Sequence, residues 1–270
     1  MLFFSANGTL WKTDGTAAGT VMVQNNGSSL IAGSPQYLTN VNGVLYFAAD
    51  DGIHGKELWK SDGSSSGTII IKDIFNGGTS DPSALNNVNG TLYFDADDGI
   101  HGYELWKSDG TNAGTQLVKD INAGSSLLIS NLESSNNLLY FTPENNSIGQ
   151  ELWKSDGTIA GSVLVKDIKT NYAFSGSNSS SPSRLTDVNG ELFFAADVGI
   201  NGNDGLWKSN GTDSGTILLL NNNYGLGLTN VNGTLFFLNG GLWKSDGTIL
   251  GTGLVKSGIE IAFYPTLVLC

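Results

Sequence analysis

The sequence predicts an all-β fold, a six-bladed β-propeller of four-stranded antiparallel blades. The phrase Leu-Trp-Lys recurs with a period of about 47 residues over most of the chain. Its six copies contain every tryptophan: Trp11, Trp59, Trp106, Trp153, Trp207 and Trp243. Four short apolar runs separated by turn residues accompany each copy, and no window has a helical period. Repeats of this length must bury their apolar faces against neighbouring repeats, as propeller blades do.

The four expected strands of one repeat are clearest in the second copy. They cover residues 38–43, 45–47, 57–63 and 68–72, each rich in β-branched or aromatic residues or in leucine. The third strand places Leu58 and Trp59 on opposite faces, yet both residues are apolar. A sheet that is apolar on both faces lies between two other layers, which favours blades packed around an axis.

The first and second strands are expected to join through two-residue turns. Asn42-Gly43 has the composition of a type I′ turn, because both residues tolerate a positive φ. The same dipeptide recurs at Asn89-Gly90, Asn189-Gly190 and Asn232-Gly233, whereas the third copy has Asn136-Asn137.

The third and fourth strands are expected to join through a Ser-Asp-Gly-Thr hairpin of constant length. Its aspartates, Asp62, Asp109, Asp156 and Asp246, are similar to those of Asp-box turns in other propellers. We expect them to accept hydrogen bonds from backbone N–H groups, a role that Asn210 can fill in the fifth copy. These residues and the six tryptophans are therefore interpreted as structural.

The two ends of the chain predict how the propeller closes. The chain opens with a second-strand sequence at residues 2–4 and ends with a first-strand sequence at residues 265–269. The C-terminal strand is therefore expected to complete the N-terminal blade, which makes residues 1–270 a single domain without exposed sheet edges. The alternative is a piece of a longer array.

The repeated motif resembles the ELWxxDGT repeat family of bacterial propeller proteins, and the resemblance extends from Leu10 to Lys256. Nearly full copies of the motif occur at residues 57–63, 104–111 and 151–158. Departures occur at Thr9, Gly241, Ser64 and Asn210. The resemblance implies a propeller, commonly on secreted or surface proteins, and it implies no established activity.

Composition limits the classes of partner. The net charge of −12 and the pI near 4.3 argue against nucleic acid, because the chain has no basic surface to meet phosphates. No apolar run is long enough for insertion into a membrane as a helix, and no secretory signal begins the chain. The only cysteine, Cys270, permits neither a disulfide framework nor a cysteine metal site.

The surplus acid lies in the loops between the second and third strands, which we expect to emerge on one face. Loops on a rigid scaffold are common binding sites, so these loops and one linker supply the candidate ligand-binding residues. They are Asp50, Asp51, His54, Asp97, Asp98, His101, Glu144, Asp197 and, as a residue for stacking on a sugar, Tyr172. The two histidines occupy equivalent places and are interpreted mainly as copies of one loop residue.

A metal site is a further hypothesis for the same loops. Asp95, Asp97 and Asp98 have the close spacing of oxygen ligands that Ca²⁺ could use, but they do not match an EF-hand loop. A solvated acidic turn is the competing interpretation. No other cofactor is indicated by the sequence.

These features together favour a non-catalytic interaction module that binds a carbohydrate or a protein through the acidic loop face. A purely structural surface domain is the first alternative. A glycan-active hydrolase or lyase is the second, because paired carboxylates perform such chemistry. We find no nucleophile and base pair, so the sequence predicts no catalytic residue. It does not predict an oligomeric state.

Overall fold

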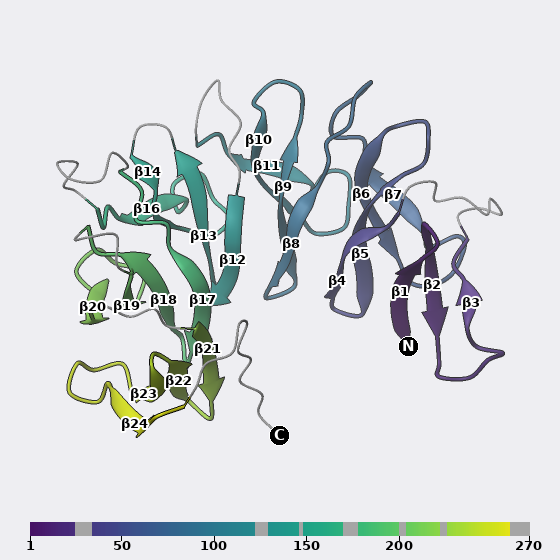
Figure 1. The fold of residues 1–270 in the computed structure, drawn as a ribbon. Helices are drawn as coiled ribbons and strands as arrows, with labels where there is room; N and C mark the ends of the chain where they lie inside the picture. The colour runs from purple at the N-terminus through teal and green to yellow at the C-terminus, as the bar shows by residue number, and fades with distance from the viewer. Residues whose placement is uncertain are drawn as a thin grey trace. The chain divides into compact units, whose positions relative to one another are not determined.

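The computed structural model describes residues 1–24, 34–121, 129–145, 148–169, 178–199, 204–221 and 226–259. The described secondary structure is entirely β, in six antiparallel sheets (Figure 1). Four sheets have four strands, one has three, and one has five because a short extra strand pairs with its second strand. The all-β prediction is confirmed, and the sheets are consistent with a propeller. No helix in these ranges could cross a membrane.

The chain divides into two compact units, Met1–Ile129 and Ser130–Cys270. The first unit has three sheets. They comprise β1 (Leu2–Ala6), β2 (Thr9–Thr13) and β3 (Val21–Met22); β4 (Gln36–Val41), β5 (Val44–Asp50), β6 (Lys56–Ser61) and β7 (Ile69–Lys72); and β8 (Ser83–Val88), β9 (Thr91–Asp97), β10 (Tyr103–Ser108) and β11 (Gln116–Lys119).

The second unit also has three sheets. They comprise β12 (Ile129–Ser135), β13 (Leu138–Asn145), β14 (Gly149–Gln150), β15 (Leu152–Ser155) and β16 (Val163–Lys166); β17 (Ser183–Val188), β18 (Glu191–Asp197), β19 (Asp204–Ser209) and β20 (Ile217–Leu220); and β21 (Leu226–Val231), β22 (Thr234–Leu238), β23 (Gly241–Ser245) and β24 (Gly253–Ser257).

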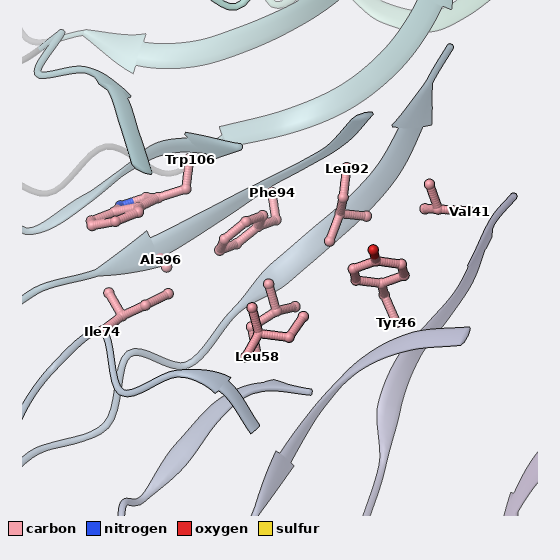
Figure 2. Packing of buried hydrophobic residues seen from close by; sticks show 9 residues of the cluster. Val41, Tyr46, Leu58, Ile74, Leu92, Phe94, Ala96 and Trp106 are labelled. Atoms are coloured by element: carbon pink, nitrogen blue, oxygen red, sulfur yellow. The ribbon is translucent and has the colours of Figure 1, made fainter. Parts of the chain in front are cut away.

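Each tryptophan lies on the third strand of its sheet, or on β2 in the three-stranded sheet. Trp59 is the cross-strand partner of Phe47, and its side chain packs with Leu10 and Val23. Leu58 belongs to a different cluster, with Tyr46 and the residues of the next sheet (Figure 2). Both faces of the β4–β7 sheet are therefore buried, as the sequence predicts from the adjacent apolar pair.

Lysines that follow the tryptophans connect successive sheets of the first unit. Lys12 Nζ donates to the carbonyl oxygen of Gly63 at 2.6 Å, and Lys60 Nζ donates to that of Gly110 at 2.8 Å. Each acceptor is the glycine of the Asp-Gly turn in the following sheet. The recurrent lysine therefore anchors each hairpin to the sheet before it.

The predicted type I′ turns are present. Asn42 and Gly43 have φ values of 51° and 86°, and the other copies are similar. The third copy keeps the same conformation, with φ of 49° at Asn136 and 64° at Asn137. Asparagine tolerates this region better than most residues, so the turn survives without glycine.

Among the described residues, the N-terminal sheet consists of β1, β2 and β3, with no first strand equivalent to those of the other sheets. Leu2 of β1 is 63% exposed, whereas the equivalent Leu45 and Leu92 are 6% and 0% exposed. A cavity of about 500 Å³ lies beside Met1, Leu2 and Leu38. The predicted closing segment, residues 265–269, falls outside the described residues, so closure and the blade count stay predictions.

The first strands of the sheets contain a left-handed residue that the sequence does not predict. A residue near the start of the strand has a positive φ in all five described copies: the second residue at Tyr37, Ala84, Arg184 and Gly227, and the third at Asn131. In four of these strands the pairing register shifts at this place, as between Ser83 and Asn86. The residue is the extra one of a β-bulge, and only the copy at Gly227 carries glycine.

Replacing Ala84 with glycine should therefore stabilise the protein by up to about 1 kcal/mol, because a left-handed alanine is strained and a glycine is not. The free energy of unfolding in urea measures the effect. Ala96→Gly, a buried position of β9 in the same sheet without a positive φ, should instead destabilise. Destabilisation by Ala84→Gly would show that the bulge carries no strain.

Candidate functional site

Two equivalent loops of the first unit hold the predicted histidines in the same way. Asp51 Oδ1 accepts hydrogen bonds from the backbone N–H groups of Ile53 and His54 at 2.9 and 2.8 Å. Asp51 Oδ2 lies 2.7 Å from His54 Nδ1. The second loop repeats these distances between Asp98 and His101. Each aspartate therefore fixes one turn and one imidazole.

The electrostatics follow from this geometry. Burial opposes ionisation of Asp51, but the hydrogen bonds from His54 and Ile53 outweigh it and lower the pKa of the carboxyl group. The hydrogen bond to Asp51 raises the pKa of His54, and the same holds for His101 beside Asp98. Each pair is favoured as an aspartate with a protonated histidine, and the histidine side chains are 39% and 36% exposed.

The other acids of these loops also bond to the backbone. Asp50 Oδ1 accepts from Gly52 N at 2.7 Å, and Asp97 Oδ1 accepts from Gly99 N at 2.7 Å. The loop tips present isoleucines instead, with Ile53 at 83% and Ile100 at 81% exposure. The carboxylates mainly shape the turns, which is the solvated-turn interpretation of their spacing.

Asp95 makes different contacts from Asp97 and Asp98. Its carboxyl group is buried, which raises its pKa, and Ser83 Oγ donates to its Oδ1 atom. Asp97 and Asp98 hold the loop that follows. Within the described residues, no group of three or more histidine, cysteine, aspartate or glutamate side chains is arranged to hold a metal ion. The structure therefore does not bring the three predicted calcium ligands together.

In the second unit, Asp197 forms an ion pair with a buried lysine. Its Oδ2 atom lies 2.7 Å from Nζ of Lys169, whose side chain is only 4% exposed. Asp204 is the cross-strand partner of Asp197. Burial raises the pKa of Asp204, and the nearby Arg184 guanidinium opposes that shift. Arg184, the only arginine of the chain, thus lies near a mixed-charge group.

Of the described ligand-binding candidates, Glu144 makes none of these contacts. Glu144 is exposed at the end of β13, where it pairs with Gln150 of β14 in register. Tyr172 falls outside the described residues. Among the described candidates, the structure brings together Asp51 with His54 and Asp98 with His101, both pairs within the first unit.

The Asp-Gly hairpins have the same hydrogen bonds in each copy. In the second copy, Asp62 Oδ1 accepts from the backbone N–H and the hydroxyl of Ser64, both at 2.7 Å. Ser61 Oγ lies 2.7 Å from Thr68 Oγ1, which closes the hairpin between the two strands. Asp109, Asp156 and Asp246 make the equivalent bonds, and Asn210 makes them with its amide oxygen.

The glutamate of the repeated motif has a role that the sequence reasoning missed. Glu57 is fully buried and accepts hydrogen bonds from the backbone N–H groups of Ile74, Phe75 and Ser80. Ser80 Oγ also donates to Glu57 Oε2 at 2.5 Å. The carboxylate therefore ties the linker that leaves β7 to the start of β6. A serine two residues before a proline, as in Ser80 and Pro82, is the signal that could have indicated the partner.

Glu151 makes the equivalent contacts in the second unit. It accepts from Ile168 N at 3.0 Å, from Ser180 N at 2.8 Å and from Ser180 Oγ at 2.5 Å. Burial raises the pKa of Glu151 to about 7, because these hydrogen bonds offset only part of the cost of desolvation. The carboxyl group therefore titrates near neutral pH.

This shift predicts a pH dependence of stability. Since the folded pKa lies above the unfolded value, Glu151 contributes most stability below about pH 4.5 and loses it as the pH rises through about 7. The difference in urea midpoint between the natural chain and Glu151→Gln should therefore shift against the natural chain from pH 5 to pH 8. A constant difference over that range would show that the carboxyl group does not titrate there.

The residue three positions before the tryptophan differs from one sheet to the next. Lys56 occupies this place in β6, where its Nζ lies 2.7 Å from Asp81 Oδ1 and 3.1 Å from Gln36 Oε1. Tyr103 donates to the other oxygen of Asp81 at 3.4 Å. Gln150 and Asp204 occupy the equivalent positions in the second unit. These polar groups differ between sheets and form the most individual feature of the chain.

The charged side chains described above hold the backbone in place or pair with one another. The carboxylates of the loops, the hairpins and the linkers accept hydrogen bonds from within the chain, as Asp51, Asp62 and Glu57 do. A general base needs a carboxylate or imidazole directed at a substrate proton. His54 and His101 are the partly exposed groups that retain a ring nitrogen beyond their bond to aspartate.

Three solved structures with a similar fold are of hydrolases. A puromycin hydrolase variant with a bound ligand matches with a TM-score of 0.53 and 12% identity, over 91% of this chain and 43% of that chain. Puromycin hydrolase itself matches with a TM-score of 0.53 and 13% identity, over 88% and 42%. A prolyl endopeptidase matches with a TM-score of 0.51 and 10% identity, over 90% and 37%. No protein-family model and no curated protein matches the sequence.

The chain thus spans less than half the length of these hydrolases. At 10 to 13% identity the similarity defines the fold alone. The resemblance to the ELWxxDGT repeat family is not confirmed by a family model.

These similarities correct the predicted function. The non-catalytic module that binds a carbohydrate or a protein through an acidic loop face is the wrong prediction, because the structures that share the fold belong to hydrolases. The physical reason lies in the loops. The acids that suggested a binding face, such as Asp50, Asp51 and Asp98, bond to the backbone of their own turns.

Proposed function

We propose that this chain serves as the propeller domain of a hydrolase of the type represented by puromycin hydrolase and the prolyl endopeptidases. The observation that carries the proposal is the match over about nine tenths of this chain to well under half of those enzymes. A propeller of this size would then work beside a catalytic region. The six-bladed form over residues 1–270 and its place among ELWxxDGT repeat proteins belong to the same proposal.

The contacts within the chain support a structural role for the propeller beside a separate catalytic region. Buried carboxylates such as Glu57 and Glu151 fasten linkers, and the hairpin aspartates fasten turns. Polar groups held this way make a rigid frame, which is what a domain that controls access to a neighbouring site requires. In the proposed arrangement the reacting groups belong to the catalytic region, and the propeller by itself does not turn over substrate.

The test compares the recombinant chain with the endogenous protein from which the sequence comes. An antibody against the chain would purify the endogenous protein, and both samples would be assayed on puromycin and on aminoacyl and prolyl p-nitroanilides. We expect hydrolysis of at least one substrate by the immunopurified protein and none by the recombinant chain.

Each other outcome is decisive. Absence of hydrolysis from the immunopurified protein would remove the link to a hydrolase. Hydrolysis by the recombinant chain, abolished with the fold by heating, would place the catalytic groups in the propeller and overturn the proposed structural role. A mock purification with unrelated antibody controls for contaminating peptidases.

A further inference from the structure

Several buried polar atoms recur without a hydrogen-bond partner in the described residues. Trp106 Nε1 and Trp207 Nε1 are buried donors of this kind, and Asp73 Oδ1 and Asp167 Oδ1 are buried acceptors. The Trp106 and Trp207 side chains are only 5% and 9% exposed. Buried polar atoms are nearly always satisfied in proteins, so a repeated exception indicates a bound group.

Two other tryptophans show how the same indole is satisfied directly. Trp11 Nε1 donates to Thr9 Oγ1 at 2.9 Å, and Trp243 Nε1 donates to the carbonyl oxygen of Asn239 at 2.8 Å. These belong to β2 and β23 and provide internal controls. The atoms without partners therefore belong to particular sheets rather than to the tryptophan position as such.

The unpartnered donor and acceptor lie at the same joint between sheets. Trp106 belongs to one cluster with Ile71 of β7 and with Ile74, which follows β7. Figure 2 shows Ile74 and Trp106 in this cluster. Lys72 Nζ lies 5.7 Å from the centre of the Trp106 ring. Asp73 directly follows Lys72 at the end of β7 and precedes Ile74 in the sequence.

The second unit repeats the arrangement with different residues. Trp207 packs in one cluster with Val165 and Ile168. Asp167 stands between those two residues, and its Oδ1 atom is buried without a partner. In each unit, an indole donor and a carboxylate acceptor without partners thus belong to the same pair of successive sheets.

The chemistry of the two atoms selects the bound group. The group must accept a hydrogen bond from an indole N–H and donate one to a carboxylate oxygen. A metal ion or an ammonium group has no lone pair for the indole, and an anion would be repelled by the aspartate. Water does both, and internal waters typically make two to four such bonds.

We propose that Trp106 with Asp73, and Trp207 with Asp167, form internal binding sites for one ordered water each, at the joints between successive sheets. The water bridges Nε1 to Oδ1 and satisfies both atoms. Satisfying a buried donor and a buried acceptor avoids the desolvation cost of leaving either atom unpaired. The sites are thereby part of what holds neighbouring sheets together.

The experiment is water-to-indole cross-relaxation by NMR on protein labelled with ¹⁵N-tryptophan. Measurement in the rotating frame separates a bound water from simple proton exchange. We expect cross-relaxation peaks at the indole protons of Trp106 and Trp207, and none at those of Trp11 and Trp243. Tryptophan to phenylalanine variants assign the signals. Absence of both peaks from the natural, folded protein would overturn the proposal.

Single substitutions then test each bridge. Asp73→Ala should abolish the water peak of Trp106 and leave that of Trp207, whereas Asp167→Ala should do the reverse. Asp73→Asn keeps an oxygen acceptor and should keep the Trp106 peak. If Asp73→Ala left the Trp106 peak unchanged, Asp73 would not be the second partner. A variant that fails to fold leaves the measurement on the natural protein decisive.

Discussion

Glu57→Ala should lower the free energy of unfolding by about 3–5 kcal/mol. The substitution removes the acceptor for three backbone N–H groups, those of Ile74, Phe75 and Ser80, and for the hydroxyl of Ser80. Ile74 and Ser80 are buried, so their N–H groups would lose this acceptor away from solvent. Urea denaturation, followed by tryptophan fluorescence, measures the loss.

Two variants make this prediction specific. Glu144→Ala removes an exposed glutamate from β13 and should change the free energy of unfolding by less than about 0.5 kcal/mol. Glu57→Gln keeps one acceptor oxygen but turns an amide N–H₂ group toward other donors, so its cost should lie between the two. If Glu57→Ala and Glu144→Ala were equally mild, the linker would be held by apolar packing and not by the carboxylate.

The architecture could be predicted because its signals are local and repeated. Each type I′ turn depends on two adjacent residues, such as Asn42 and Gly43, whose φ values are positive as expected. The burial of both Leu58 and Trp59 follows from their alternation on one strand. Features of this kind need no knowledge of what lies across the sheet.

Other features depend on contacts that are distant in sequence. Glu57 acquires its role from a linker 17 to 23 residues away, and Lys169 from an aspartate 28 residues away. The bulge at Ala84 arises from the pairing of β8 with β9, and alanine gives no sign of it. Composition alone shows none of these relations.

Only part of the candidate site could be predicted, because the sequence shows which residues are neighbours in a loop and not which groups they bond to. Proximity in sequence correctly placed Asp51 near His54, but it read the carboxylates as free ligands for a partner. The backbone N–H groups of Ile53 and His54 take one oxygen of Asp51, and the imidazole takes the other. An aspartate before a glycine has this local use in most turns, so acid content alone does not measure binding capacity.

The second large effect concerns the glycine that closes each Asp-Gly hairpin. A Cβ atom added at Gly251 would lie 2.0 Å from Oδ1 of Asp246, the atom that accepts hydrogen bonds from Thr248. Gly251→Ala must therefore displace the aspartate and break the turn. We expect a loss of about 2–4 kcal/mol in the stability of this hairpin, from the clash and the lost hydrogen bonds together.

Gly253→Ala is the matched control, because it lies two residues further along the same hairpin. A Cβ atom there would meet nothing within 4 Å, and its φ is not in the left-handed region. Amide hydrogen exchange of residues 246–252 should accelerate strongly in Gly251→Ala and little in Gly253→Ala. Because the five other copies place the equivalent Cβ within 2.1 Å of the turn residue's Oδ1 atom, Gly114→Ala should reproduce the effect at Asp109. Equal exchange rates in the two variants of the last hairpin would mean that the aspartate turn does not hold it.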